Sequence, residues 1–428
     1  MTYHSLMKEK DIVNYILFIF ILFSFFLGFY FDEDSAGGGK IDLIQHEWNN
    51  IKLFKSVPLS EALTSLEYAS SRNPLFLIIH KYNFFANDIN GLRLSTFLTG
   101  IITFILLYFC IKKYFKNIPN SLIILLSSFI FLSPYFRTSV FWSNQEHLAI
   151  LFFIISCMFL KLNDYDLENK IKLLCYHILS SLFSFLAFYV DQKFFFMPII
   201  VYFFFIYKNS FKFFLFFSII NFLFFIPAIY LFYQWGGIVP IESQSRISLT
   251  PFNFNIFISN IGVYFVPFLL LNCYEKKKDY LKLNKAQILL LLIITYLIYL
   301  FLPEQAPPEG GGFIFRLLYE MYNNSFILQS WFFVKLTLFI LNIGFVYLIL
   351  IFLEINFRSL TVMISLVSIY MMTYYTYQSY VDPIIFIMFY ILLNVKNINL
   401  VNQKFVYISG IFYTSILLGS ITFRSVIG

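Results

Sequence analysis

The chain has 428 residues, of which 60% are hydrophobic, 22% aromatic and only 12% charged, with a net charge of +7 and a mean hydropathy of +0.77. Soluble globular domains carry about 25% charged residues, so this composition excludes that class. It also excludes intrinsic disorder, nucleic-acid binding and a disulfide scaffold, since the chain is very apolar, has no basic stripe and has only four cysteines. An all-α, polytopic protein of the lipid bilayer remains.

Apolar segments follow one another along the whole chain. A bilayer crossing needs about 20 apolar residues, and the pattern predicts about 13 of them, several being short. The predicted spans are 12–31, 92–111, 121–135, 145–161, 172–189, 194–207, 213–233, 256–273, 286–302, 331–353, 360–377, 383–395 and 405–422. Lys and Arg concentrate in alternate loops, which predicts a cytoplasmic N-terminus. With no repeat and no linker, residues 1–428 are predicted to form one membrane domain.

Three consecutive acids, Asp32, Glu33 and Asp34, end the first predicted span. Adjacent like charges repel one another, and a structural anchor at the interface would need only one of them. Their pattern indicates a functional role as general base or metal ligand. Glycines 37–39 follow, and they allow the backbone to approach a ligand closely, but they form no nucleotide-binding fingerprint.

The first outer loop, residues 32–91, is far longer than a connection between neighbouring helices requires. Apolar residues recur in it at helical spacing, at Ile41, Ile44, Trp48, Ile51 and Phe54, then at Leu59, Leu63 and Leu66 after Pro58. A third helix is predicted from Pro74, with Asn73 as its cap. These helices are expected to lie on the membrane surface. The alternative is that they only cover the top of the bundle.

Two later outer turns are also polar. One holds Arg137, followed by the run Asn144-Gln145-Glu146-His147, and the other holds Asp191-Gln192-Lys193. A lysine among aromatic residues at the membrane surface is costly unless it snorkels or has an anionic partner, for which Asp191 and a lipid phosphate are the candidates. Both turns and the acidic run share one membrane depth, so they are expected to meet. Helix capping and snorkelling are the alternatives.

The outer loop at residues 303–330 begins with prolines and continues into three glycines. Such a loop is typical either of a lid or of a flexible connection. Cys110, Cys157, Cys175 and Cys273 fall in the inner halves of spans and are expected to be unpaired core residues. The histidines and cysteines have no ligand-pair spacing, so no zinc site is predicted.

Four segments, in chain order, resemble motifs of one enzyme family. They are the Pro-hydrophobic run at residues 72–79, Gly91–Ser95 leading into the second span, the turn Ser143–Ala149, and Lys193 followed by Pro198. The family is the GT-C type of membrane glycosyltransferases, in the group that uses dolichyl or polyprenyl phosphate to transfer mannose or aminoarabinose. The sequence departs from it at Asn73, where His or Pro is frequent, and at Ser379-Tyr380, where the family has Arg-Tyr.

This resemblance implies transfer of a sugar from a polyprenyl-phosphate donor to an unidentified acceptor at the periplasmic face of a bacterial inner membrane. The catalytic base would be Asp32 or Glu33, with Asp34 also eligible, and Lys193 would bind the donor phosphate with help from Arg137. Gln145, Glu146 and Asp191 complete the expected substrate-binding set. No nucleotide or redox cofactor is expected, and a divalent cation is left open. The alternatives are an O-antigen-type polymerase or ligase using polyprenyl-diphosphate glycans, and a transporter or flippase.

Overall fold

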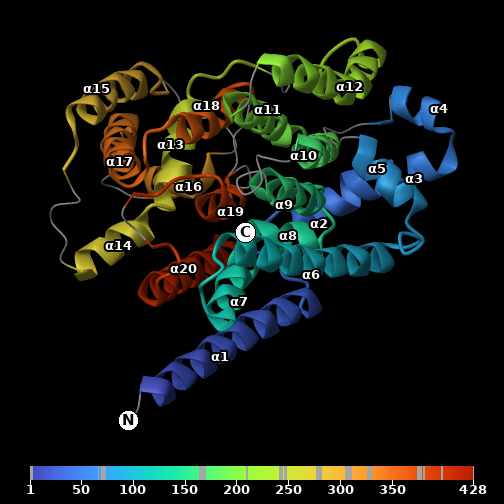
Figure 1. Ribbon diagram of the computed structural model, residues 1–428. Coiled ribbons are helices and arrows are strands. Elements are labelled where there is room, and N and C mark those ends of the chain that lie inside the picture. Colours follow the sequence, from blue (N-terminus) through green and yellow to red (C-terminus); the bar gives the residue numbers. More distant parts are fainter. Residues whose placement is uncertain are drawn as a thin grey trace. The chain divides into compact units, whose positions relative to one another are not determined.

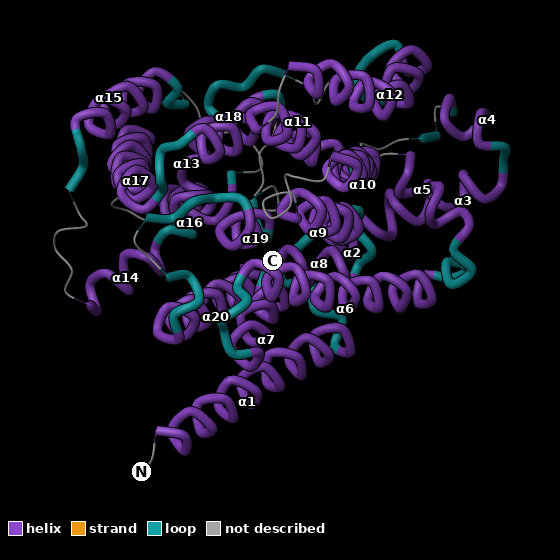
Figure 2. The backbone as a smooth tube through the Cα atoms, viewed as in Figure 1, coloured by secondary structure: helices purple, strands orange, loops and turns teal. Residues whose placement is uncertain are grey.

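The computed structural model describes residues 3–65, 67–68, 74–162, 170–208, 211–240, 244, 248–275, 282–303, 311–324, 330–373, 378, 381–396 and 399–427. In these ranges the structure is helical, apart from turns and an isolated β-bridge between Leu353 and Val395. The all-α prediction is therefore confirmed (Figures 1 and 2). The helices gather into two compact units, residues 1–245 with 410–428 and residues 246–409, where the sequence predicts one domain.

The first unit holds the predicted outer loop and the polar turns. Its helices are α1 (Tyr3–Tyr30), α2 (Gly39–Asp42), the π-helix η1 (Leu43–Glu47), α3 (Trp48–Ser56), α4 (Leu59–Thr64), α5 (Pro74–Tyr82), α6 (Ile89–Tyr114), α7 (Asn120–Ser128), the 3-10 helix η2 (Phe129–Leu132), α8 (Pro134–Phe141), α9 (Glu146–Leu162), α10 (Lys170–Val190), the 3-10 helix η4 (Gln192–Phe195), α11 (Phe196–Lys208), α12 (Phe211–Trp235) and, from residue 410 onward, α20 (Gln403–Ile427). The first outer loop thus forms short helices where their apolar spacing predicts them, while Leu66 and Asn73 lie outside the described residues.

The second unit contains α13 (Asn253–Val263), α14 (Val266–Glu275), α15 (Lys285–Leu300), α16 (Gly312–Asn324), α17 (Trp331–Phe352), α18 (Phe357–Met371) and α19 (Ile384–Ile391). Its central helix α13 is buried and is tied to α15 by Asn255, whose Nδ2 donates to the carbonyls of Ile298 (3.2 Å) and Phe301 (2.7 Å). Within the predicted lid, residues 312–324 form α16, and residues 304–310 and 325–329 lie outside the described residues.

Six helices in the described ranges are long and apolar enough to cross a membrane, and two bent pairs raise the number to eight. Four shorter apolar helices, of 10 to 17 residues, occupy further predicted spans. The span predicted at 383–395 differs most, because α19 has eight residues and a length of about 12 Å, against a hydrocarbon core of about 30 Å. The chain therefore has the helices of a membrane protein, with fewer full-length spans than the hydropathy pattern predicts.

A sharp bend between α7 and α8 positions the first polar turn. The two segments meet at 71°, and Pro134 at the start of α8 cannot continue the hydrogen-bond ladder of the preceding helix. Ser133 caps α8 by accepting a hydrogen bond from the Phe136 amide at 3.0 Å. An aromatic cluster packs α1 against this bend, with the Phe25 ring 4.2 Å from that of Phe131 and 5.0 Å from that of Phe141. The bend places Arg137 beside the end of α1.

Candidate functional site

The acidic run lies in the loop between α1 and α2, against α8. Asp32 adopts a left-handed backbone conformation (φ 56°), which turns the chain away from the axis of α1. The loop is then fastened to α8, because Ser35 Oγ donates to the Pro134 carbonyl (3.1 Å) and the Ala36 amide donates to Thr138 Oγ1 (2.9 Å). The three carboxylates therefore point in different directions and have different partners.

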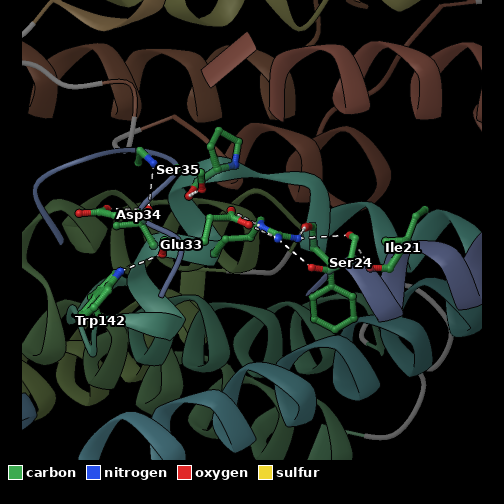
Figure 3. A network of polar contacts seen from close by, with 11 residues as sticks. Ile21, Ser24, Glu33, Asp34, Ser35 and Trp142 are labelled. Carbon is green, nitrogen blue, oxygen red and sulfur yellow. Dashed lines mark hydrogen bonds and ion pairs between the residues drawn. The ribbon is translucent and has the colours of Figure 1, made fainter. Parts of the chain in front are cut away.

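Glu33 forms a buried ion pair with Arg137. The Arg137 side chain is 2% exposed and the Glu33 side chain 15%, and the guanidinium binds both carboxylate oxygens, through Nε (2.7 Å) and through Nη2. Its remaining N–H groups donate to the Ser24 carbonyl and hydroxyl and to the Phe131 carbonyl. Figure 3 shows Glu33 between Ser24 and Trp142, whose Nε1 donates to the Glu33 carbonyl at 2.8 Å. All five donors of Arg137 are thus engaged within the protein, which leaves none for a substrate phosphate.

Asp32 is the accessible carboxylate of the three. Its side chain is 55% exposed, and Oδ1 accepts a hydrogen bond from Nη2 of Arg93 at 2.6 Å. Arg93 is itself held in place, because Nε donates to the Phe141 carbonyl (2.8 Å) and the guanidinium lies 4.1 Å from the centroid of the Trp142 ring. Asp32 therefore combines an open carboxylate with a fixed orientation, so a molecule arriving from solvent can reach it.

Asp34 is more enclosed. Its Oδ1 accepts a hydrogen bond from Thr138 Oγ1 and its Oδ2 from the Lys40 amide, both at 3.2 Å. The exposed Lys40 side chain stands beside this group, with Nζ 5.5 Å from the centroid of the Trp142 ring. Asp34 thus shapes the loop through these two hydrogen bonds.

Lys193 forms a second polar group with Glu146 and Asp191. Its Nζ lies 3.0 Å from Glu146 Oε1 and 3.2 Å from Asp191 Oδ2, and the three side chains are 7%, 20% and 5% exposed. The neighbouring Gln145 is buried, and its Oε1 has no hydrogen-bond partner among the described residues. The predicted pairing of Lys193 with Asp191 is therefore present, and Glu146 joins it. Arg137 belongs instead to the acidic loop, so the expected single cluster is divided into two groups.

Sequence reasoning did not select Arg93, Trp142 or Lys40 as site residues. An arginine in the first turns of a long apolar helix is rare, and that was the available signal for Arg93. Among the described residues, no three or more His, Cys, Asp or Glu side chains are placed to hold a metal ion together, so the structure offers no support for the metal-ligand interpretation of the acidic run.

His80, on α5, is buried. Burial lowers the pKa of His80 from 6.5 to about 3, and the nearby His147 and Lys55 act in the same direction. In the unfolded chain this imidazole becomes protonated as the pH falls below about 6.5, whereas in the folded protein it stays neutral down to about pH 3. Protonation therefore favours the unfolded state, and below pH 6.5 the free energy of unfolding falls by about 1.4 kcal/mol per pH unit for this group. Thermal unfolding in detergent between pH 7 and pH 5 should show a steeper loss for the wild type than for His80→Gln. Equal slopes would contradict the buried neutral imidazole.

No protein-family model, curated protein or solved structure matches this chain.

Proposed function

We propose that the chain is a membrane glycosyltransferase of the GT-C type, which transfers a sugar from a polyprenyl phosphate to an acceptor at the outer face of the membrane. One observation carries this proposal. Asp32, which follows the end of the long apolar helix α1, has an exposed carboxylate that is oriented by the nearly buried Arg93. A base at this depth can reach the reactive bond of a substrate whose lipid tail remains in the bilayer.

The layout of thirteen crossings belongs to this proposal. Residues 35 and 36, just beyond the C-terminal end of α1, bind Ser420 and Arg424, near the C-terminal end of α20. If both helices cross the membrane, the termini are on opposite sides and the number of crossings is odd. If each of the six long helices, two bent pairs and four shorter helices crosses once, the total is even, so one more crossing is required. We assign it to α19 and the apolar residues that flank it. With a cytoplasmic N-terminus, the acidic loop faces the periplasm of a bacterial inner membrane.

In the proposed reaction, Asp32 removes the proton from an acceptor hydroxyl or amine. The freed lone pair attacks the anomeric carbon of the donor sugar, and the bond between that carbon and the phosphate oxygen breaks. The polyprenyl phosphate leaves with the electrons of that bond, and the lysine ammonium groups stabilise its growing negative charge. Lys193 is the donor-phosphate residue that the resemblance implies, and Lys40 lies near the Trp142 ring that Arg93, the partner of Asp32, also contacts. Glu33 and Asp34 hold the loop in shape.

Substitutions at Lys193 and at its partner Glu146 should change the KM for the donor in opposite directions. Glu146 and Asp191 neutralise its charge in the structure, so a phosphate must compete for the ammonium with Glu146, the more exposed of the two carboxylates. Lys193→Met should raise the KM for the donor by about tenfold or more, whereas Glu146→Gln, which removes the competing carboxylate, should lower it. Steady-state kinetics with varied donor would measure both. An unchanged KM in both variants would remove Lys193 from the donor site.

The proposed reaction can be tested on purified protein in detergent. Polyprenyl-monophosphate sugars and polyprenyl-diphosphate oligosaccharides are supplied separately, together with a mixture of glycan, lipid and peptide acceptors, and released lipid phosphate is measured. Release from the monophosphate donor is the expected result. Release from the diphosphate alone would favour a polymerase or ligase. Absence of release from both donors, with flipping of the donor lipid in proteoliposomes, would favour a transporter and contradict the proposal.

A further inference from the structure

The last turns of α20 bind the backbone of the acidic loop. Ser420 Oγ donates to the Ser35 carbonyl at 2.7 Å, and Arg424 Nη2 donates to the Ala36 carbonyl at 2.8 Å. Ser420 and Arg424 are four residues apart and so lie on one face of the helix. Their partners precede them in the chain by 385 and 388 residues. The end of the chain therefore contacts the segment that follows the three acids.

Gly37 shows how closely Arg424 approaches this loop. A Cβ atom added at Gly37 would lie 2.3 Å from Cζ of Arg424, and the backbone there has a φ of +76°, which favours glycine. At Gly38, where φ is +86°, an added Cβ would meet nothing within 4 Å. The Arg424 guanidinium thus occupies the space that a side chain at residue 37 would take.

The same segment is held from its other side by α8, through the bonds from Ser35 Oγ to the Pro134 carbonyl and from the Ala36 amide to Thr138 Oγ1. Residues 35–37 therefore lie between two helices that hold them by hydrogen bonds. A loop with three successive glycines has high conformational entropy, which such external bonds must overcome to give it a single conformation.

We infer that Ser420 and Arg424 are positioning residues, which hold residues 35–37 and through them the carboxylates of the acidic loop. Ser420 supplies a neutral donor, and Arg424 supplies a donor and covers the Gly37 peptide. The catalytic consequence rests on the proposed function, since a base displaced by about 1 Å can lose up to a hundredfold in rate. The structural part of the inference does not depend on that function.

Hydrogen–deuterium exchange tests the structural part without any substrate. In Ser420→Ala/Arg424→Ala, the amides of residues 33–40 should exchange at least about tenfold faster, whereas exchange in α6 should be unchanged. The matched control is Thr422→Ala/Ser425→Ala, because among the described residues these two hydroxyls donate to carbonyls of their own helix, at Leu418 and Thr422. Equal exchange in the two double variants would overturn the inference.

A second pair of variants tests the same contact from the loop side. Gly37→Ala and Gly38→Ala impose similar backbone strain, but only the first places a methyl group against the Arg424 guanidinium. Gly37→Ala should therefore accelerate loop exchange more than Gly38→Ala, and the difference should disappear in an Arg424→Ala background. A difference that persists in that background would show that Arg424 is not its cause.

Activity measurements then separate positioning from general stability. We expect the double alanine variant to lower kcat by about tenfold with little change in the KM for the donor, and Arg424→Lys to restore part of the loss because lysine can also donate to the Ala36 carbonyl. Faster exchange with unchanged kcat would contradict the positioning role. If the wild type proved to have no transferase activity, the proposed function would fail while the exchange result would still decide whether α20 holds the loop.

Discussion

Replacement of Asp32 by asparagine is expected to lower the rate of sugar transfer by about 10²- to 10⁴-fold, the usual contribution of a general base. Asparagine keeps an oxygen that can accept the hydrogen bond from Arg93, so the loop should keep its shape while the group loses its ability to take a proton. Because the Asp32 side chain is 55% exposed and water screens its pairing with Arg93, the unfolding temperature should fall far less than in Glu33→Ala. Release of lipid phosphate at saturating donor and acceptor measures the effect.

Asp34→Asn is the matched control, because it makes the same chemical change two residues away. An asparagine there can still accept from the Lys40 amide through Oδ1, and its Nδ2 can donate to Thr138 Oγ1 because a hydroxyl can also accept, so this variant should affect turnover far less than Asp32→Asn. Full activity in Asp32→Asn together with a large loss in Asp34→Asn would assign the base to Asp34. Full activity in both variants would remove the carboxylate mechanism.

Most of the helices could be predicted from sequence because a bilayer crossing is a local property. A run of about 20 apolar residues, as in α6 and α17, must satisfy its backbone hydrogen bonds within itself and therefore becomes a helix. Amphipathic spacing predicts α3 and α4, and Pro74 at a first helical position predicts α5, for a similar local reason. Hydropathy cannot distinguish a full crossing from a short buried helix. The apolar segment at 383–395 is therefore predicted as a span, although its helix α19 has only eight residues.

The partners of the charged residues could not be predicted, because they depend on which helices pack together. The shared membrane depth predicts that Arg137 and Lys193 lie in one polar cluster, and the family resemblance implies that they bind the donor phosphate. In the structure, the bend before α8 directs Arg137 to Glu33, 104 residues earlier in the chain, and Lys193 pairs with Glu146 and Asp191. Nothing in the sequence around Arg424 indicated a contact with the acidic loop, because that contact depends on α20 packing beside the end of α1. The sequence thus selected polar residues that do form ion pairs in the structure, but it did not indicate which of them pair with one another.

The second large effect is expected at Glu33, and it concerns stability. Glu33→Ala should lower the free energy of unfolding by about 3–5 kcal/mol, because it leaves the guanidinium of Arg137, 2% exposed, without a compensating charge. Gly28 gives this pair its space, since a Cβ there would lie 2.3 Å from Nη2 of Arg137 and 2.5 Å from Oε2 of Glu33. Unfolding in mixed micelles with increasing SDS would measure the loss, and Gly28→Ala should reproduce a large part of it.

The double variant Glu33→Met/Arg137→Met separates a structural ion pair from a catalytic acid. Removing both charges from a nearly buried site avoids the uncompensated guanidinium, so this variant should be more stable than Glu33→Ala and should approach the wild type. If Glu33 only supports the loop, the recovery of stability should bring back much of the transfer activity, because Asp32 and Arg93 are intact. A stable double variant without activity would instead place Glu33 in the chemistry, and a Glu33→Ala protein as stable as the wild type would show that the pair does not hold the loop to α8.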